Sequence, residues 1–187
     1  MGRYRLLTSS VMASCALLCF TTLTGCGPAN PPRTLPATLD AGSLPEAARA
    51  ALDDVWPNAW SIAPLASQVS SCLSGKPAAA IVTSDFDSDG ATDIAAAVTT
   101  PKGVRLVALL QREDHYALFN IDSLGDQGAS AGLGLAKRGA MFTKATSLFK
   151  DFYPADTLTA YACTGPTTSY LWGGLAFYKV ALAGAKP

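Results

Sequence analysis

Residues 94–121 read IAAAVTTPKGVRLVALLQREDHYALFNI, and this stretch decides the fold class. Three apolar runs are separated by short polar segments with turn-forming residues, which is typical of strands joined by hairpins. The middle run, residues 104–110, is almost entirely apolar, so we expect it to be a central strand. The stretch predicts a mainly β domain, a small antiparallel sheet or sandwich of hairpins, with an α+β fold as the alternative.

The same pattern of short apolar runs and turn residues continues through the second half of the chain. A Gly173-Gly174 pair predicts a two-residue hairpin turn, because glycine accepts positive φ angles at no steric cost. Residues 141–152 have aromatic side chains at helical spacing and could form a second helix or a long loop. We expect strands at residues 78–83, 94–99, 104–111, 116–121, 132–136, 157–163, 170–172 and 175–182.

One short helix is expected before the strands. Ser43 can cap it, and Glu46 stands three residues later as in a capping box. Pro57 should end the helix at Trp56. The apolar residues that fall on one face are Leu44, Ala47, Ala48, Ala51, Leu52 and Val55.

The composition is that of a single globular domain. The chain has 187 residues, with 14 basic and 14 acidic side chains and 49% hydrophobic residues. This balance excludes a highly charged disordered tail and a polytopic membrane protein. Lys137 and Arg138 are the only adjacent basic residues, so no basic stripe marks a nucleic-acid surface. We therefore expect no nucleic-acid partner.

Residues 1–25 have the organisation of a secretory leader. Arg3 and Arg5 precede an apolar run at residues 11–20 that is too short to span a bilayer. Residues 23–26, Leu-Thr-Gly-Cys, then resemble the lipobox of bacterial lipoproteins. The resemblance implies cleavage before Cys26, which would carry lipid, palmitate included, on its thiol and amino groups. The alternative is an ordinary secretory signal with Cys26 left unmodified.

The resemblance also suggests a location in the cell envelope. Gly27 stands where lipoproteins retained in the inner membrane often have Asp, which favours an outer-membrane anchor. Residues 26–40 contain four prolines and read as an extended tether, and residues 41–187 as a single β-rich domain. Cys72 and Cys163 are the cysteines left after the leader and Cys26. Because thiols outside the cytosol usually pair, we expect a disulfide, with two buried free thiols as the alternative.

The chemistry of the sequence is concentrated in residues 85–93, which read DFDSDGATD. Carboxylates at positions one, three, five and nine, with the carbonyl at position seven, can converge on one hard cation. The oxygen-only ligand set favours Ca²⁺, and Gly90 stands where the chain must turn. An EF-hand would need Glu at the position of Ala96. The expected ligands are Asp85, Asp87, Asp89, Asp93 and the carbonyl of Ala91.

Residues 84–94 resemble the calcium loop of FG-GAP and VCBS repeats. The motif occurs once, whereas a propeller needs repeated blades. A looser resemblance is to small bacterial lipoproteins of unknown role. A structural ion that stabilises the turn is expected, with a calcium-gated function and an ion-free loop as alternatives.

We expect no catalysis and interpret the protein as a lipid-anchored envelope binding or structural accessory, with an envelope protein or a glycan as possible partner. The alternative is a phosphohydrolase that uses the Asp85 and Asp87 pair, because residues 78–87 resemble the nucleophile strand of haloacid dehalogenase type phosphatases. His115 follows Asp114 at an expected hairpin turn and reads as a solvated turn residue.

Overall fold

The computed structural model describes residues 41–64, 79–125, 131–163 and 166–183. All the described residues belong to the compact unit Pro32–Pro187. The other unit, Met1–Pro31, contains none of the described residues. The predicted leader, the tether at residues 26–40 with Cys26, and Cys72 therefore also lie outside the described residues. Within the described ranges, no helix is long and apolar enough to cross a bilayer.

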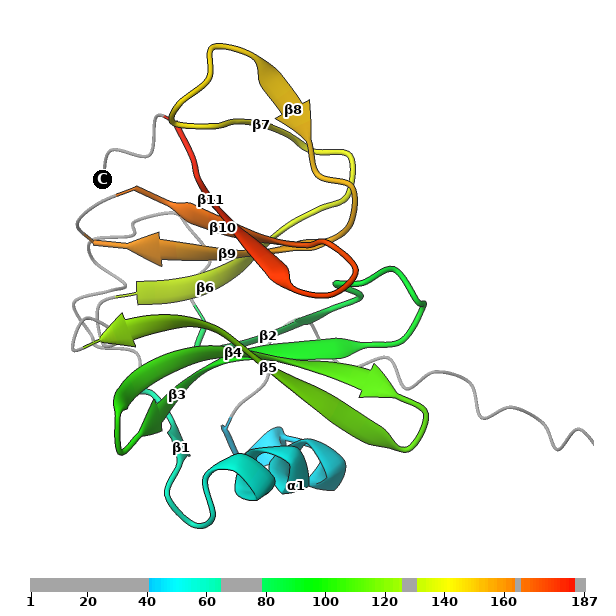
Figure 1. Cartoon of the computed structure of the whole chain (residues 1–187), viewed down its shortest axis with the longest axis vertical. Coiled ribbons are helices and arrows are strands. Elements are labelled where there is room, and N and C mark those ends of the chain that lie inside the picture. Colours follow the sequence, from blue (N-terminus) through cyan, green and yellow to red (C-terminus); the bar gives the residue numbers. More distant parts are fainter. Residues whose placement is uncertain (1–40, 65–78, 126–130, 164–165, 184–187) are drawn as a thin grey trace, which may run out of the picture. The chain divides into compact units, whose positions relative to one another are not determined.

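The fold is mainly β with antiparallel sheets and one short α-helix, as predicted (Figure 1). Every expected strand has a counterpart, and three short strands, β1, β7 and β8, were not expected. The elements are η1 (Ala41–Ser43), α1 (Glu46–Val55), β1 (Ser61–Ile62), β2 (Ile81–Ser84), β3 (Asp93–Thr100), β4 (Gly103–Arg112), β5 (His115–Gly125), β6 (Ala131–Ala136), β7 (Met141–Thr143), β8 (Lys150–Phe152), β9 (Thr157–Ala162), β10 (Thr168–Trp172) and β11 (Phe177–Ala181).

The described strands form two larger sheets and a separate hairpin. The first sheet has the order β1-β3-β4-β5. The strand β2 also pairs with β3, along the same edge of β3 as β1. The second has the order β11-β10-β9-β6, and β7 pairs with β8. A bridge with two backbone hydrogen bonds between Ala79 and Leu133 links the edges of the two sheets.

The first sheet is the middle layer of three, with α1 on one face and the second sheet on the other (Figure 1). Successive side chains of a strand point to opposite faces. In β4, Leu106 and Leu110 therefore pack against the second sheet, while Val107 and Leu109 pack toward α1. Burial on both faces explains why residues 104–110 are almost continuously apolar. Each fully buried aliphatic side chain contributes about 1.5–3 kcal/mol.

The helix begins two residues later than a Ser43 cap predicted. Pro45 is the N-cap residue, and no side chain caps the helix. Because a proline disfavours helical geometry in the residue before it, Leu44 cannot join the helix. The end is as predicted, with α1 finishing at Val55 before Trp56 and Pro57. Val55 is nevertheless 49% exposed, so the buried face is narrower than expected.

The β10–β11 hairpin has a four-residue loop, so the predicted two-residue Gly173-Gly174 turn is wrong. Trp172 pairs with Phe177, and Gly173 N–H donates to the carbonyl of Ala176. This register places the rings of Trp172 and Phe177 5.1 Å apart, both against Phe119 of β5. Packing of these three rings between the sheets outweighs the local preference for a tight turn.

Residues 141–152 form the β7–β8 hairpin, so the helical alternative for this segment is wrong. Phe142 is buried and stacks on Tyr153 with ring centroids 4.4 Å apart. Leu148 and Phe149, which supplied the helical spacing, are 98% and 83% exposed. The spacing therefore does not mark a face that packs on a core.

Candidate metal centre

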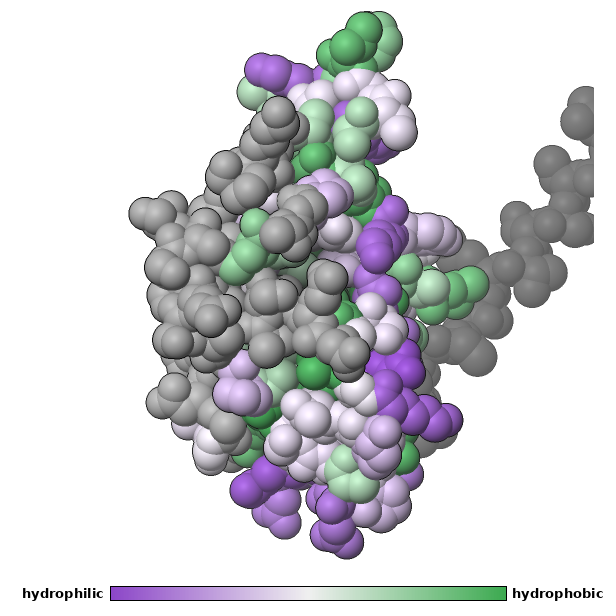
Figure 2. Space-filling view, turned by 90° about the vertical axis from the view of Figure 1, so that its left-hand side faces the viewer, coloured by the Kyte–Doolittle hydropathy of each residue, from purple (hydrophilic) through white to green (hydrophobic). Residues whose placement is uncertain are grey.

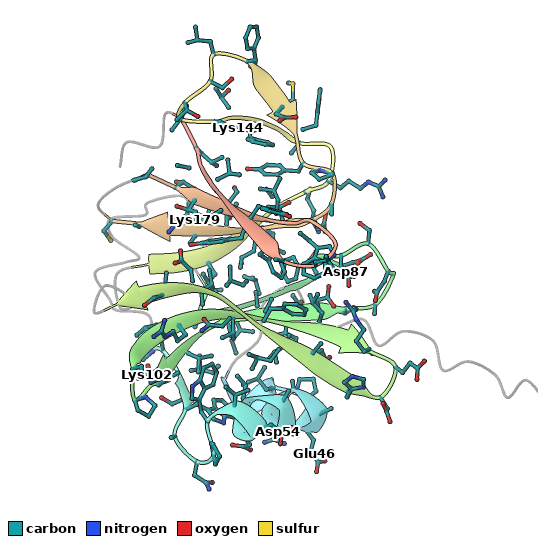
Figure 3. The ribbon with its side chains drawn as sticks, in the orientation of Figure 1. Glu46, Asp54, Asp87, Lys102, Lys144 and Lys179 are labelled. Atoms are coloured by element: carbon teal, nitrogen blue, oxygen red, sulfur yellow. The ribbon has the colours of Figure 1, made fainter. Side chains whose placement is uncertain are left out.

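The acidic residues occupy the loop that joins β2 to β3 (Figure 3). The two strands are antiparallel, and Ser84 pairs with Asp93 at the base of the loop. The chain reverses within the loop through positive φ angles at Ser88 (63°) and Gly90 (88°). Left-handed geometry costs a residue with a Cβ roughly 1–2 kcal/mol, so the backbone conformation itself accounts for glycine at position 90.

Asp85, Asp87 and Asp89 are brought together, with one carboxylate oxygen of each within 4.8 Å of the others. Backbone amides of the loop contact all three of them. The Asp89 N–H donates to Oδ1 of Asp85 (3.1 Å) and lies 3.2 Å from Oδ1 of Asp87. The Gly90 N–H donates to Oδ2 of Asp85 at 3.1 Å, and the Ala91 N–H to Oδ1 of Asp89 at 2.8 Å. Three predicted ligands thus form one group of hard oxygen donors, with Ala91 on the same loop.

Asp93 is placed differently from the other three carboxylates. It is fully buried, and its Oδ2 accepts the N–H of Phe86 at 2.8 Å while its Oδ1 accepts the N–H of Gln111 at 2.9 Å. Burial raises the pKa of Asp93 to about 7; the two amide hydrogen bonds oppose that rise, and the charges of Asp87 and Asp89 add to it. Asp93 therefore links the loop to β4 through these two hydrogen bonds, and it is not one of the three carboxylates that form the group.

Arg112, at the end of β4, is a site residue that the sequence did not reveal. Its Nη2 lies 2.6 Å from Oδ2 of Asp87, and its Nη1 lies 2.8 Å from Oδ2 of Asp89. Desolvation lowers the pKa of Arg112, but the hydrogen bond that its guanidinium donates to Asp87 and the charges of the surrounding carboxylates outweigh this, so the pKa is raised. The Asp87 side chain is 6% exposed and that of Arg112 34%, so the guanidinium covers the group from the solvent side.

The remaining predicted residues lie apart from this group. Cys163, which directly follows β9, is disulfide-bonded; its predicted partner Cys72 is outside the described residues, as is Cys26. The His115 side chain is 67% exposed beside Asp114 at the β4–β5 turn, as expected for a solvated turn residue.

Comparisons with protein-family models, with curated proteins and with solved structures found no match to this chain.

Proposed function

We propose that this protein is a lipid-anchored, extracytoplasmic calcium-binding β domain that serves the cell envelope as a binding or structural accessory. The lipobox-like residues 23–26 support the anchor, through lipid on Cys26, and Gly27 supports an outer-membrane location. The acidic loop supports the calcium site. The partner on the envelope is a protein or a glycan.

The observation that carries the calcium proposal is the charge balance of the loop. Asp85, Asp87 and Asp89 bring three negative charges within 4.8 Å, and Arg112 supplies one positive charge. Arg112 therefore neutralises only part of this negative charge, and the excess favours a divalent cation in its place. Carboxylate oxygens, with backbone carbonyl and water, are the ligands that Ca²⁺ prefers.

Arg112 would leave the group when the ion binds. Its two contacts are with Oδ2 of Asp87 and Oδ2 of Asp89, and its side chain is partly exposed. An ion that binds all three carboxylates of the β2–β3 loop would stabilise this hairpin more than a single guanidinium does. The role of the ion is therefore to stabilise the turn.

Thermal unfolding with excess Ca²⁺, with excess Mg²⁺ and with chelator tests the calcium site. We expect a Ca²⁺-selective rise in Tm that corresponds to about 2.7 kcal/mol at a hundredfold excess over Kd. Asp87→Asn should abolish the rise, and Asp114→Asn, which removes a 94% exposed carboxylate from the neighbouring turn, should keep it. Equal Tm values in Ca²⁺ and chelator for the unaltered protein would refute the site.

The anchor has a separate test in cells. Labelled palmitate should be incorporated into the full chain, and the protein should fractionate with the outer membrane. Cys26→Ser should lose both the label and the membrane association. If this variant keeps the label, the lipid is not on Cys26.

The phosphohydrolase alternative gains no support from the described strands. The nucleophile strand of that enzyme class belongs to a parallel sheet, whereas β2 pairs with β3 in antiparallel fashion. Asp87, one of the two carboxylates that the alternative needs, is held by Arg112.

A further inference from the structure

The β7–β8 hairpin carries an unusual share of the exposed apolar side chains. Leu148, Phe149, Phe152 and Met141 are 98%, 83%, 60% and 58% exposed, and they are four of the seven exposed large hydrophobic residues in the described part of the chain. In Figure 2 the top of the molecule is a hydrophobic protrusion beside hydrophilic residues. Contiguous exposed apolar groups of this kind mark interaction sites.

The tip of the hairpin, residues 144–149, is hydrogen-bonded to the C-terminal end of β11. Ala145 N–H donates to the carbonyl of Ala181, and Ala183 N–H donates to that of Thr143, both at 2.8 Å. Below them, Tyr153 stacks on Phe142 and its hydroxyl hydrogen-bonds Ser169 of β10 at 2.8 Å. The exposed apolar residues therefore belong to a hairpin that is itself packed on the rest of the domain.

The same segment is basic. Residues 137–156 contain four basic residues and two acidic ones, although the whole chain is neutral, and Lys137 pairs with Asp156 at 2.6 Å. Lys144 pairs with Asp151 at 3.1 Å, while Arg138 and Lys150 have no ion-pair partner among the described residues. Lys150 also lines a cavity of about 420 Å³ beside the hairpin, together with Met141 and other residues. Cations and apolar side chains thus share one surface.

We propose that the tip of the β7–β8 hairpin docks on an anionic lipid surface. Leu148 and Phe149 would enter the boundary between headgroups and acyl chains, and Lys150, which pairs with Thr143 at the tip end of the hairpin, would contact lipid phosphates. Each basic residue near an anionic membrane contributes about 1 kcal/mol, and buried apolar area adds to it. The combination of protruding apolar groups and flanking cations fits this interface.

A second copy of the chain fits the tip less well. A symmetric dimer brings the same patch of both subunits together. It would therefore bring two hairpins with a surplus of positive charge against each other, which is unfavourable. An anionic lipid surface instead attracts those charges.

This contact is distinct from the proposed anchor. Figure 3 shows Lys144 on the hairpin at one end of the described unit, and Glu46 and Asp54 on α1 at the other. The described residues begin with η1, which directly precedes α1 in the chain. Docking through the hairpin would therefore be a second membrane contact, and it does not depend on lipid at Cys26 or on calcium.

Vesicle co-sedimentation of residues 32–187 tests the proposal. This segment is one compact unit that contains both hydrophobic clusters and lacks Cys26, and circular dichroism would verify the fold of every variant. Vesicles are phosphatidylcholine alone or with about 30% phosphatidylglycerol, and chelator removes any calcium bridge. We expect binding to the anionic vesicles only, weakening as salt is raised.

Variants separate the two components of the contact. The double variant Leu148→Ser/Phe149→Ser should weaken binding by about tenfold or more, and Lys150→Gln should weaken it and reduce its salt dependence. Leu175→Ser is the matched control, because Leu175 is 88% exposed on the other hairpin, and it should bind normally. The proposal is overturned if the anionic vesicles are not bound, or if the Leu148/Phe149 variant binds as well as the control. It is also overturned if sedimentation velocity shows a dimer that this variant abolishes.

Discussion

The hydroxyl of Tyr170 in β10 donates a hydrogen bond to Oδ2 of Asp122 in β5 at 2.7 Å, and so joins the two sheets across their interface. Lys179 of β11 contacts the same oxygen at 2.6 Å. Burial, followed by the hydrogen bond and charge of Asp122, raises the pKa of Tyr170, so the hydroxyl remains a donor at physiological pH. The link is a polar contact at the edge of an apolar core.

Tyr170→Phe should destabilise the domain by about 1–2 kcal/mol, because the partly buried Asp122 loses one donor while the ring stays in place. Chemical denaturation measures the change. Tyr178→Phe is the control, since Tyr178 is 59% exposed, and it should change stability by less than about 0.5 kcal/mol. An equal effect of the two substitutions would show that the cross-sheet hydrogen bond contributes nothing.

Stability should fall on acidification partly through Asp122. Burial raises the pKa of Asp122, but the hydrogen bonds from Lys179, Tyr170 and the Ser123 amide outweigh burial, so the pKa lies below its ordinary value. A carboxylate with a lowered folded-state pKa stabilises the fold above its unfolded-state pKa. That contribution is lost as the pH falls through the folded-state pKa, which means below about pH 4.

Asp122→Asn removes this contribution, so the difference in unfolding free energy from the unaltered protein should be largest near neutral pH and should shrink on acidification. Denaturation curves recorded at a series of pH values measure it. Asp54→Asn removes an exposed carboxylate of α1 and is the control for a general charge effect. A difference for Asp122→Asn that stays constant with pH would contradict the assignment.

Arg112→Gln should increase calcium affinity. Arg112 neutralises Asp87 and Asp89, and the proposed ion must displace it. Removing this competitor should lower the Kd for Ca²⁺ by roughly fivefold, which corresponds to about 1 kcal/mol. Isothermal titration calorimetry gives the Kd directly. If the loop instead binds no ion, Arg112→Gln should lower Tm, and Ca²⁺ should fail to restore it.

Thr159→Val should stabilise the protein. Thr159 in β9 is 2% exposed, and its Oγ1 has no hydrogen-bond partner among the described residues. Valine fits a strand and leaves no polar atom to desolvate, so we expect a gain of about 1 kcal/mol in unfolding free energy. Thr157→Val is the matched control, because that equally buried hydroxyl donates to the carbonyl of Ala155 at 3.0 Å. The control should lose about 1 kcal/mol, and a stabilising effect there would contradict the argument.

The strands were predictable because their signal is local. Alternation and apolar runs located β3, β4 and β5 within one to four residues at each end. The segment at 141–152 was not predictable in the same way. Its spacing of aromatic residues is typical of a helix. The stacking of Phe142 on Tyr153 and the pairing of β7 with β8 instead produce a hairpin.

The sequence by itself determined that Asp85, Asp87 and Asp89 meet, because they alternate within one five-residue turn and their amide contacts span five residues or fewer. Only the tertiary structure decided the rest of the site. The pairing of β3 with β4 brings Gln111 to Asp93 and Arg112 to Asp87, across 18 and 25 residues of chain. Register between strands depends on how both faces of the sheet are buried, which no local pattern around residue 85 contains.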